Sequence, residues 1–118
     1  MLRRMAHEYE WMKNKLGFLL HMEGNDLVLI LDQEFIDACG TGKWGPLVFN
    51  RYPGPYERVI LDMSQCKIIQ STVFAEMLHI RDLYQKAVSD GIYLRHPSQR
   101  IQTVLDIMQI GQLFKIIP

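Results

Sequence analysis

The sequence has only two cysteines, Cys39 and Cys66, and no excess of either charge. Two cysteines are too few for a disulfide framework, so we expect two free thiols in a reducing compartment. Thirteen basic residues balance thirteen acidic residues, which gives a formal net charge of zero. A protein that binds nucleic acid or an anionic lipid surface needs a basic excess or a basic face. We therefore expect protein partners and no nucleic acid.

Long hydrophobic runs are also missing. The longest, Phe18–Leu20 and Leu27–Leu31, are far too short to span a bilayer. Charged and polar residues interrupt the N-terminus from Arg3 to Lys15, where an export signal needs an apolar core. These two absences predict a cytoplasmic protein with no membrane insertion.

Motifs for metals and cofactors are absent as well. The histidines are scattered along the chain, and none has metal-ligand spacing with a cysteine. The run Gly40-Thr41-Gly42-Lys43 lacks the spacing of a phosphate-binding loop, and Trp44 follows the lysine where a metal-binding hydroxyl would stand. We expect no metal and no cofactor.

The length of 118 residues suits one domain, and 48% apolar with 22% charged residues indicates a globular chain. No internal repeat is present. Residues 1–15 carry apolar residues at steps of three and four, which predicts a short N-terminal helix or a loosely held arm. Residues 16–118 are expected to form a single domain.

Apolar runs and helical stripes alternate along that domain. Two short runs, 17–23 and 26–31, flank Gly24-Asn25 and predict a β-hairpin. The irregular stretch 32–57 has room for a short helix over 33–38 and a turn of helix over 47–52. The continuous apolar run in 58–63 is typical of a central strand.

The second half is more regular. A helix is predicted over 72–88, with Glu76 and His79 on its outer face and a buried stripe opposite them, made by Val73, Met77, Ile80, Tyr84, Ala87 and Val88. A strand over 92–95 follows. Ser98 should cap a further helix whose buried stripe is Ile101, Val104, Leu105 and Met108, and Gly111 should end it. A last strand is predicted within 113–117, and the order favours an α/β fold: a mixed sheet of four to five strands with helices packed on it.

Five phrases in this half occur in a particular order. They are Val59-Ile60-Leu61-Asp62-Met63-Ser64, Ile69-Gln70-Ser71-Thr72-Val73, Gly91-Ile92-Tyr93-Leu94, Pro97-Ser98, and Ile110-Gly111-Gln112-Leu113-Phe114-Lys115-Ile116. Their order and spacing resemble the STAS domain of anti-sigma-factor antagonists, apart from about two extra residues near 88–90. The resemblance covers residues 58–118, and Leu31-Asp32 matches the family more loosely.

The resemblance implies candidate phosphorylation sites. Thr72 aligns with the hydroxyl that accepts phosphate in simple antagonists, whereas Ser71 aligns with the acceptor of stressosome-type members. Gln70 stands where the family usually has Asp, and Val73 where its best-known members have Gly, which argues for a lost switch.

The physical chemistry of the position leaves two interpretations open. A helix N-terminus tolerates a phosphate, whose charge of about −1.5 to −2 changes what can dock there. Alternatively, Ser71 or Thr72 only caps the helix.

The resemblance therefore implies a regulatory binding module that is not an enzyme. Its partner would be an anti-sigma factor or a related Ser/Thr kinase-like regulator, or other STAS proteins, and a homo-oligomer is compatible with the family. The expected partner-binding residues are Asp32, Gln70, Ser71, Thr72 and Val73. Two alternatives stay open: a constitutive scaffold or transporter-accessory subunit without a switch, and an enzyme with a pocket in residues 32–56.

Overall fold

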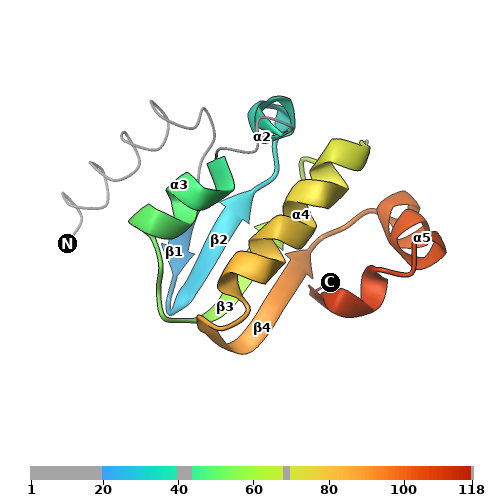
Figure 1. Ribbon diagram of the computed structural model, residues 1–118. Helices are drawn as coiled ribbons and strands as arrows, with labels where there is room; N and C mark the ends of the chain where they lie inside the picture. Colours follow the sequence, from blue (N-terminus) through green and yellow to red (C-terminus); the bar gives the residue numbers. More distant parts are fainter. Residues whose placement is uncertain (1–19, 40–43, 68–69, 118) are drawn as a thin grey trace.

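The structure, a computed structural model, describes residues 20–39, 44–67 and 70–117 (Figure 1). Its five strands form one sheet in the order β1-β2-β3-β4-β5. β1 runs antiparallel to β2, and the pairs β2–β3, β3–β4 and β4–β5 are parallel. This confirms the predicted α/β fold with a mixed sheet. The predicted N-terminal helix or arm lies outside the described residues.

The hairpin forms where it was predicted. β1 (Leu20–Glu23) and β2 (Asp26–Ile30) pair with Glu23 opposite Asp26. The turn needs a left-handed residue, and Gly24 supplies it at φ 62°.

The long connection after β2 folds into two helices. α2 (Gln33–Ala38) matches the prediction, whereas α3 (Trp44–Arg51) begins before the predicted turn of helix. Gly45 and Pro46 do not break α3 because they lie in its first turn, where a proline costs no intrahelical hydrogen bond. β3 (Tyr56–Asp62) then enters the centre of the sheet.

The helix predicted over 72–88 is shorter than expected. α4 spans Ser71–Tyr84, with Gln85 as its C-cap, and Val88 already belongs to β4 (Val88–Arg95). The apolar residues Ala87 and Val88 continue the helical periodicity, which misled the prediction. In the structure the amide of Tyr56 donates to the Ala87 carbonyl at 2.8 Å, and Val88 pairs with Tyr56 as a strand residue.

The C-terminal elements follow the predicted order, but one boundary is wrong. α5 (Gln99–Ile107) is capped by Ser98 as predicted. The residue with left-handed backbone conformation after this helix is Gln109, at φ 60°, and not Gly111. Gly111 instead begins a 3-10 helix, η1 (Gly111–Leu113), which leads to β5 (Lys115–Ile117). Met108 was predicted to be buried and is 45% exposed, because the helix has already ended there.

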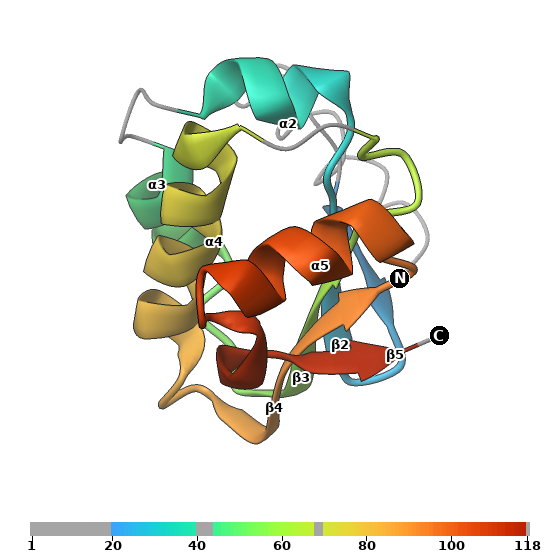
Figure 2. The same cartoon turned by 90° about the vertical axis from the view of Figure 1, so that its right-hand side faces the viewer.

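A single core joins the helices to one face of the sheet. Its members come from alternate strand positions and from the inner faces of the helices: Leu27, Leu29, Val59, Leu61, Ile92, Leu94, Phe35, Val73, Met77, Ile80, Ile101 and Leu105. Figure 2 shows the resulting layers, with the helices on one side of the sheet. The other positions of the strands carry the charged side chains described below and the buried residues Val28 and Ile60.

Candidate functional site at the start of α4

Parallel pairing brings the predicted site residues to one edge of the sheet. The amide of Leu31 bonds the carbonyl of Asp62, and the amide of Met63 bonds the carbonyl of Arg95, so β2, β3 and β4 end side by side. The chain leaves β2 toward α2 and leaves β3 toward α4 at this edge. Both views place α2 and the first turn of α4 at the same end of the molecule (Figures 1 and 2).

Asp32 has a structural role at this edge. Its Oδ1 accepts a hydrogen bond from the amide of Phe35 at 2.9 Å, which caps α2. The side chain is half-buried, so one part of the carboxylate holds the helix while the rest faces solvent.

Gln70, Ser71 and Thr72 form the exposed start of α4. Gln70 is the N-cap residue, but its side chain makes no capping hydrogen bond. Its carbonyl accepts the amides of Val73 and Phe74 at 3.0 and 3.3 Å. The amides of Ser71 and Thr72 precede the first intrahelical bond, so this turn keeps unpaired donors and a partial positive charge.

The hydroxyls of Ser71 and Thr72 are not helix caps. Both residues follow the N-cap, both are exposed, and within the described part of the chain neither side chain makes a hydrogen bond. The capping interpretation is therefore wrong for either hydroxyl. Each is accessible to a modifying enzyme or to a partner.

Val73 lies on the buried stripe that the helical periodicity predicted, whereas Glu76 does not lie on the outer face. Val73 is fully buried and packs in the core, so its side chain is not part of the exposed surface. Glu76 was predicted on the outer face but is only 6% exposed. Its Oε2 is buried without a hydrogen bond and lies 3.9 Å from Nδ1 of His79. Burial, then the charge of Glu76, raises the pKa of Cys39 to about 12, so that thiol is not a nucleophile at neutral pH.

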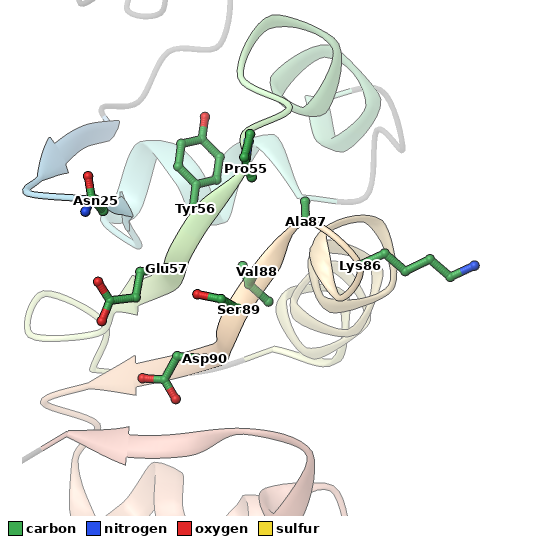
Figure 3. A pocket seen from close by; sticks show the side chains of 9 residues that line it. All are labelled: Asn25, Pro55, Tyr56, Glu57, Lys86, Ala87, Val88, Ser89 and Asp90. Carbon is green, nitrogen blue, oxygen red and sulfur yellow. The ribbon is translucent and has the colours of Figure 1, made fainter.

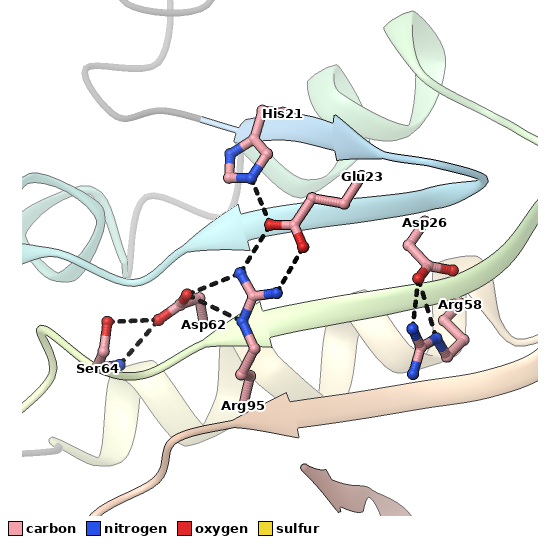
Figure 4. Close-up of polar contacts among 7 residues, drawn as sticks. All are labelled: His21, Glu23, Asp26, Arg58, Asp62, Ser64 and Arg95. Carbon is pink, nitrogen blue, oxygen red and sulfur yellow. Dashed lines mark hydrogen bonds and ion pairs between the residues drawn. The ribbon is translucent and has the colours of Figure 1, made fainter. Parts of the chain in front are cut away.

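A network of charges crosses the sheet face opposite the helices (Figure 4). Arg95 on β4 donates two hydrogen bonds to Glu23 on β1, at 2.7 and 2.9 Å. It donates two more to Oδ2 of Asp62 on β3, at 3.1 and 2.9 Å. Ser64 donates to the other oxygen of Asp62 at 2.6 Å, and Nε2 of His21 lies 2.7 Å from Glu23.

These contacts set the charge states of the carboxylates. The hydrogen bonds from Arg95, with a smaller effect from His21, lower the pKa of Glu23 to about 2. Burial raises the pKa of Asp62, but the hydrogen bonds from Ser64 and Arg95 outweigh it and the net shift is downward. Glu23 and Asp62 are thus both ionised at neutral pH, and the network connects the end of β3 to the edge strand β1.

A second ion pair lies on the same face. Arg58 donates to Oδ2 of Asp26 at 3.0 and 2.7 Å, although Asp26 is only 7% exposed. The pair joins β2 to β3 (Figure 4). Sequence analysis missed both clusters. In the sequence, the only indication of these clusters is a charged residue at every second or fourth position of a strand. That spacing does not show which charged residues pair.

A shallow groove lies at the opposite edge, where β3 and β4 begin (Figure 3). It has a volume of about 630 Å³, and Asn25, Tyr56, Glu57, Ser89 and Asp90 contribute to its lining. Its polar groups are partly used within the fold, since the Tyr56 hydroxyl donates to the carbonyl of Tyr52 at 2.9 Å. Among the described residues of the irregular region, 32–39 and 44–56, Pro55 and Tyr56 alone reach this groove.

Two further properties concern the described ranges alone. Residues 20–39, 44–67 and 70–117 contain no group of three potential metal ligands placed to hold an ion. No helix in these ranges has the length and apolar character needed to cross a bilayer.

The fold resembles that of two solved structures. An NMR structure of the protein TM1081 superposes with a TM-score of 0.70 at 18% identity, covering 85% of this chain and 79% of that one. A crystal structure of the Thermotoga maritima protein, which is named a putative anti-sigma factor antagonist, gives a TM-score of 0.64 at 18% identity with 85% of each chain covered. No protein-family model and no curated protein matches the sequence. The chain has a STAS-like fold, as predicted.

Proposed function

We propose that this chain is a non-catalytic regulatory module that binds an anti-sigma factor or a related Ser/Thr kinase-like regulator in the cytoplasm. Phosphorylation at the start of α4 would switch the binding. The observation that carries the proposal is the exposure of the Ser71 and Thr72 hydroxyls on an uncapped helix start. The STAS-like fold shared with the Thermotoga maritima protein named a putative anti-sigma factor antagonist supports the choice of partner.

The mechanism follows from charge. In the unmodified state, the first turn of α4 offers unpaired amides, two hydroxyls and a partial positive charge to a partner. A phosphate adds a charge of about −1.5 to −2 and a hydrated volume at that position. A partner surface that is apolar or acidic is then repelled.

A direct test compares partner binding by the unmodified and modified forms. The protein is isolated from its native cells with associated proteins, and each associated protein is then purified and titrated against wild type, Ser71→Asp and Thr72→Asp. Ser89→Asp is the matched control, because Ser89 is an exposed serine near the opposite edge of the sheet. We expect at least one substitution in α4 to weaken binding by tenfold or more, about 1.4 kcal/mol, while the control binds as wild type does.

A second function is supported by Gln70. The family's carboxylate is missing there, and the Gln70 side chain makes no capping bond in its place. This favours a constitutive scaffold or a transporter-accessory subunit that binds its partner, another STAS protein or a second copy without modification. Wild-type binding by Ser71→Asp and Thr72→Asp alike would reject the switch and select this second function.

A further inference from the structure

Two aliphatic residues are buried on the sheet face opposite the helices. Val28 on β2 and Ile60 on β3 are register partners, and they are 0% and 1% exposed. They are not members of the core cluster, because side chains alternate along a strand and their neighbours in sequence point toward the helices. The described helices α2, α3, α4 and α5 all contribute to that core, so none of them covers Val28 and Ile60 (Figure 2).

The side chains around this pair stand beside it. His21 on β1 is opposite Val28, and Tyr93 on β4 is opposite Ile60. The ion pairs occupy the rows on either side, and their charged ends are directed at each other (Figure 4). Side chains stand roughly perpendicular to a sheet, so such neighbours close the sides of an aliphatic residue and leave its outer end open. Complete burial of Val28 and Ile60 therefore requires a cover over the face.

A polar group on the same face is also incompletely satisfied. Asp26 is only 7% exposed, and its Oδ2 accepts both hydrogen bonds from Arg58. Its Oδ1 is buried without a hydrogen bond. A buried carboxylate oxygen without a donor costs free energy, so this face favours a cover that carries basic side chains.

The N-terminal segment, residues 1–19, is placed to reach this face. It ends directly before Leu20, the first residue of β1, and β1 is an edge strand of the sheet. A helix over residues 1–15 would be about 22 Å long. The strands β1 and β3 are about 10 Å apart, at two strand spacings. The segment is therefore long enough to cross β2 and β3.

The composition of the N-terminal segment suits the face. It has four basic residues against two acidic residues. The two ion-pair clusters of the face contain three carboxylates against two guanidinium groups, so the charges are complementary. The segment also has an apolar stripe at helical steps of three and four, made by Leu2, Met5, Tyr9 and Met12.

We propose that the N-terminal segment packs across the open sheet face of its own chain and covers Val28 and Ile60. The apolar stripe lies on the aliphatic pair, and the basic side chains lie over the carboxylates. This docking closes the face to other proteins and leaves the start of α4 exposed at the edge of the sheet. It does not depend on the proposed function, because it needs neither a partner nor a modification.

Methyl NMR of the full-length wild-type chain tests the contact directly. The methyl groups of Met, Val and Ile are labelled with ¹³C, and Met5→Leu and Met12→Leu assign the two methionine signals. We expect nuclear Overhauser effects between the methyl groups of Val28 or Ile60 and those of Met5 or Met12. The absence of these effects for both methionines would overturn the proposal.

A mixture of differently labelled chains identifies the source of the segment. Effects within one chain support the proposal. Effects only between two chains would overturn it and make the face an interface between copies.

Urea unfolding of the full chain tests the energetic consequence. The double substitution Met5→Gln with Met12→Gln keeps the length and helix propensity of both side chains but removes their apolar ends. We expect it to reduce the folding equilibrium constant by about tenfold or more, because two buried methionine side chains become polar. Ile107→Gln is the matched control, since Ile107 is 75% exposed on α5, and it should change the constant by less than about threefold. An effect of the double substitution no larger than that of the control would overturn the docking.

Discussion

Replacing Arg95 with Met should destabilise the fold through the loss of the cross-sheet network. The Met side chain keeps much of the apolar stem of Arg95 but removes the guanidinium that contacts Glu23 and Asp62. The side chain of Asp62 is only 14% exposed. The free energy contributed by its ion pair with Arg95 should therefore lie between that of a surface pair, about 0.5 kcal/mol, and that of a buried pair, about 3 kcal/mol. We assign about 1.5 kcal/mol to that contact.

The contact with Glu23 contributes less. A pKa lowered from 4.5 to about 2 corresponds at face value to about 3 kcal/mol. The Glu23 side chain is 42% exposed, and solvent screening reduces this to about 0.5 kcal/mol. The expected loss in Arg95→Met is therefore about 2 kcal/mol in total at pH 7.

The loss should depend on pH with a defined sign. The pKa of Glu23 is lower in the folded state than its ordinary value of 4.5, and that of Asp62 is also lowered. Their stabilisation is present above those ordinary values and disappears as pH falls through the folded-state values. The difference between wild type and Arg95→Met should thus shrink between about pH 4.5 and pH 2.

Urea unfolding followed by circular dichroism at pH 7 and at pH 2–3 measures both effects. Arg100→Met is the control, since Arg100 is exposed on α5 and its loss should cost less than about 0.5 kcal/mol. A loss below that value in Arg95→Met at pH 7, or a loss that is the same at both pH values, would refute the reasoning.

Three other substitutions test the helix starts and the core by the same unfolding measurement. Gln70→Asp should stabilise α4 by about 1 kcal/mol, because a carboxylate at an N-cap accepts from unpaired amides; an unchanged midpoint would contradict this. Ser98→Ala should cost about 1 kcal/mol, because it removes the bond from the Ile101 amide at 3.2 Å; a neutral effect would mean that solvent replaces the cap. Leu61→Ala should cost about 3 kcal/mol, because Leu61 is fully buried on the central strand; a cost below 1 kcal/mol would contradict the described core.

Local patterns in the sequence were sufficient for most of the fold. Gly24 supplies the left-handed residue of a tight turn, and Ser98 bonds the amide three residues ahead, so the hairpin and the start of α5 depend on neighbouring residues alone. The apolar run at 59–61 required a strand covered on both faces, and these residues are at most 1% exposed. The order of the elements then led to the prediction of a mixed sheet.

The candidate site was predicted only in part. The positions of Ser71 and Thr72 near a helix start were predicted, but their exposure and the failure of Gln70 to cap depend on where the helix begins. Val73 was predicted both on the buried stripe of the helix and among the partner-binding residues, and the structure places its side chain in the core. Glu76 was assigned to the outer face because helical periodicity places it opposite the apolar stripe.

Tertiary structure decided what periodicity could not. The periodicity of Ala87 and Val88 fits a helix as well as a strand. Contacts with Tyr56 place Val88 in β4 and Ala87 directly before it. Arg95 and Glu23 are 72 residues apart, and they meet only because the sheet order brings β4 and β1 onto the same layer. The sequence by itself determined the elements and their order, because these depend on interactions over a few residues. Packing among distant segments decided which side chains meet across the sheet and that the Glu76 carboxylate is buried.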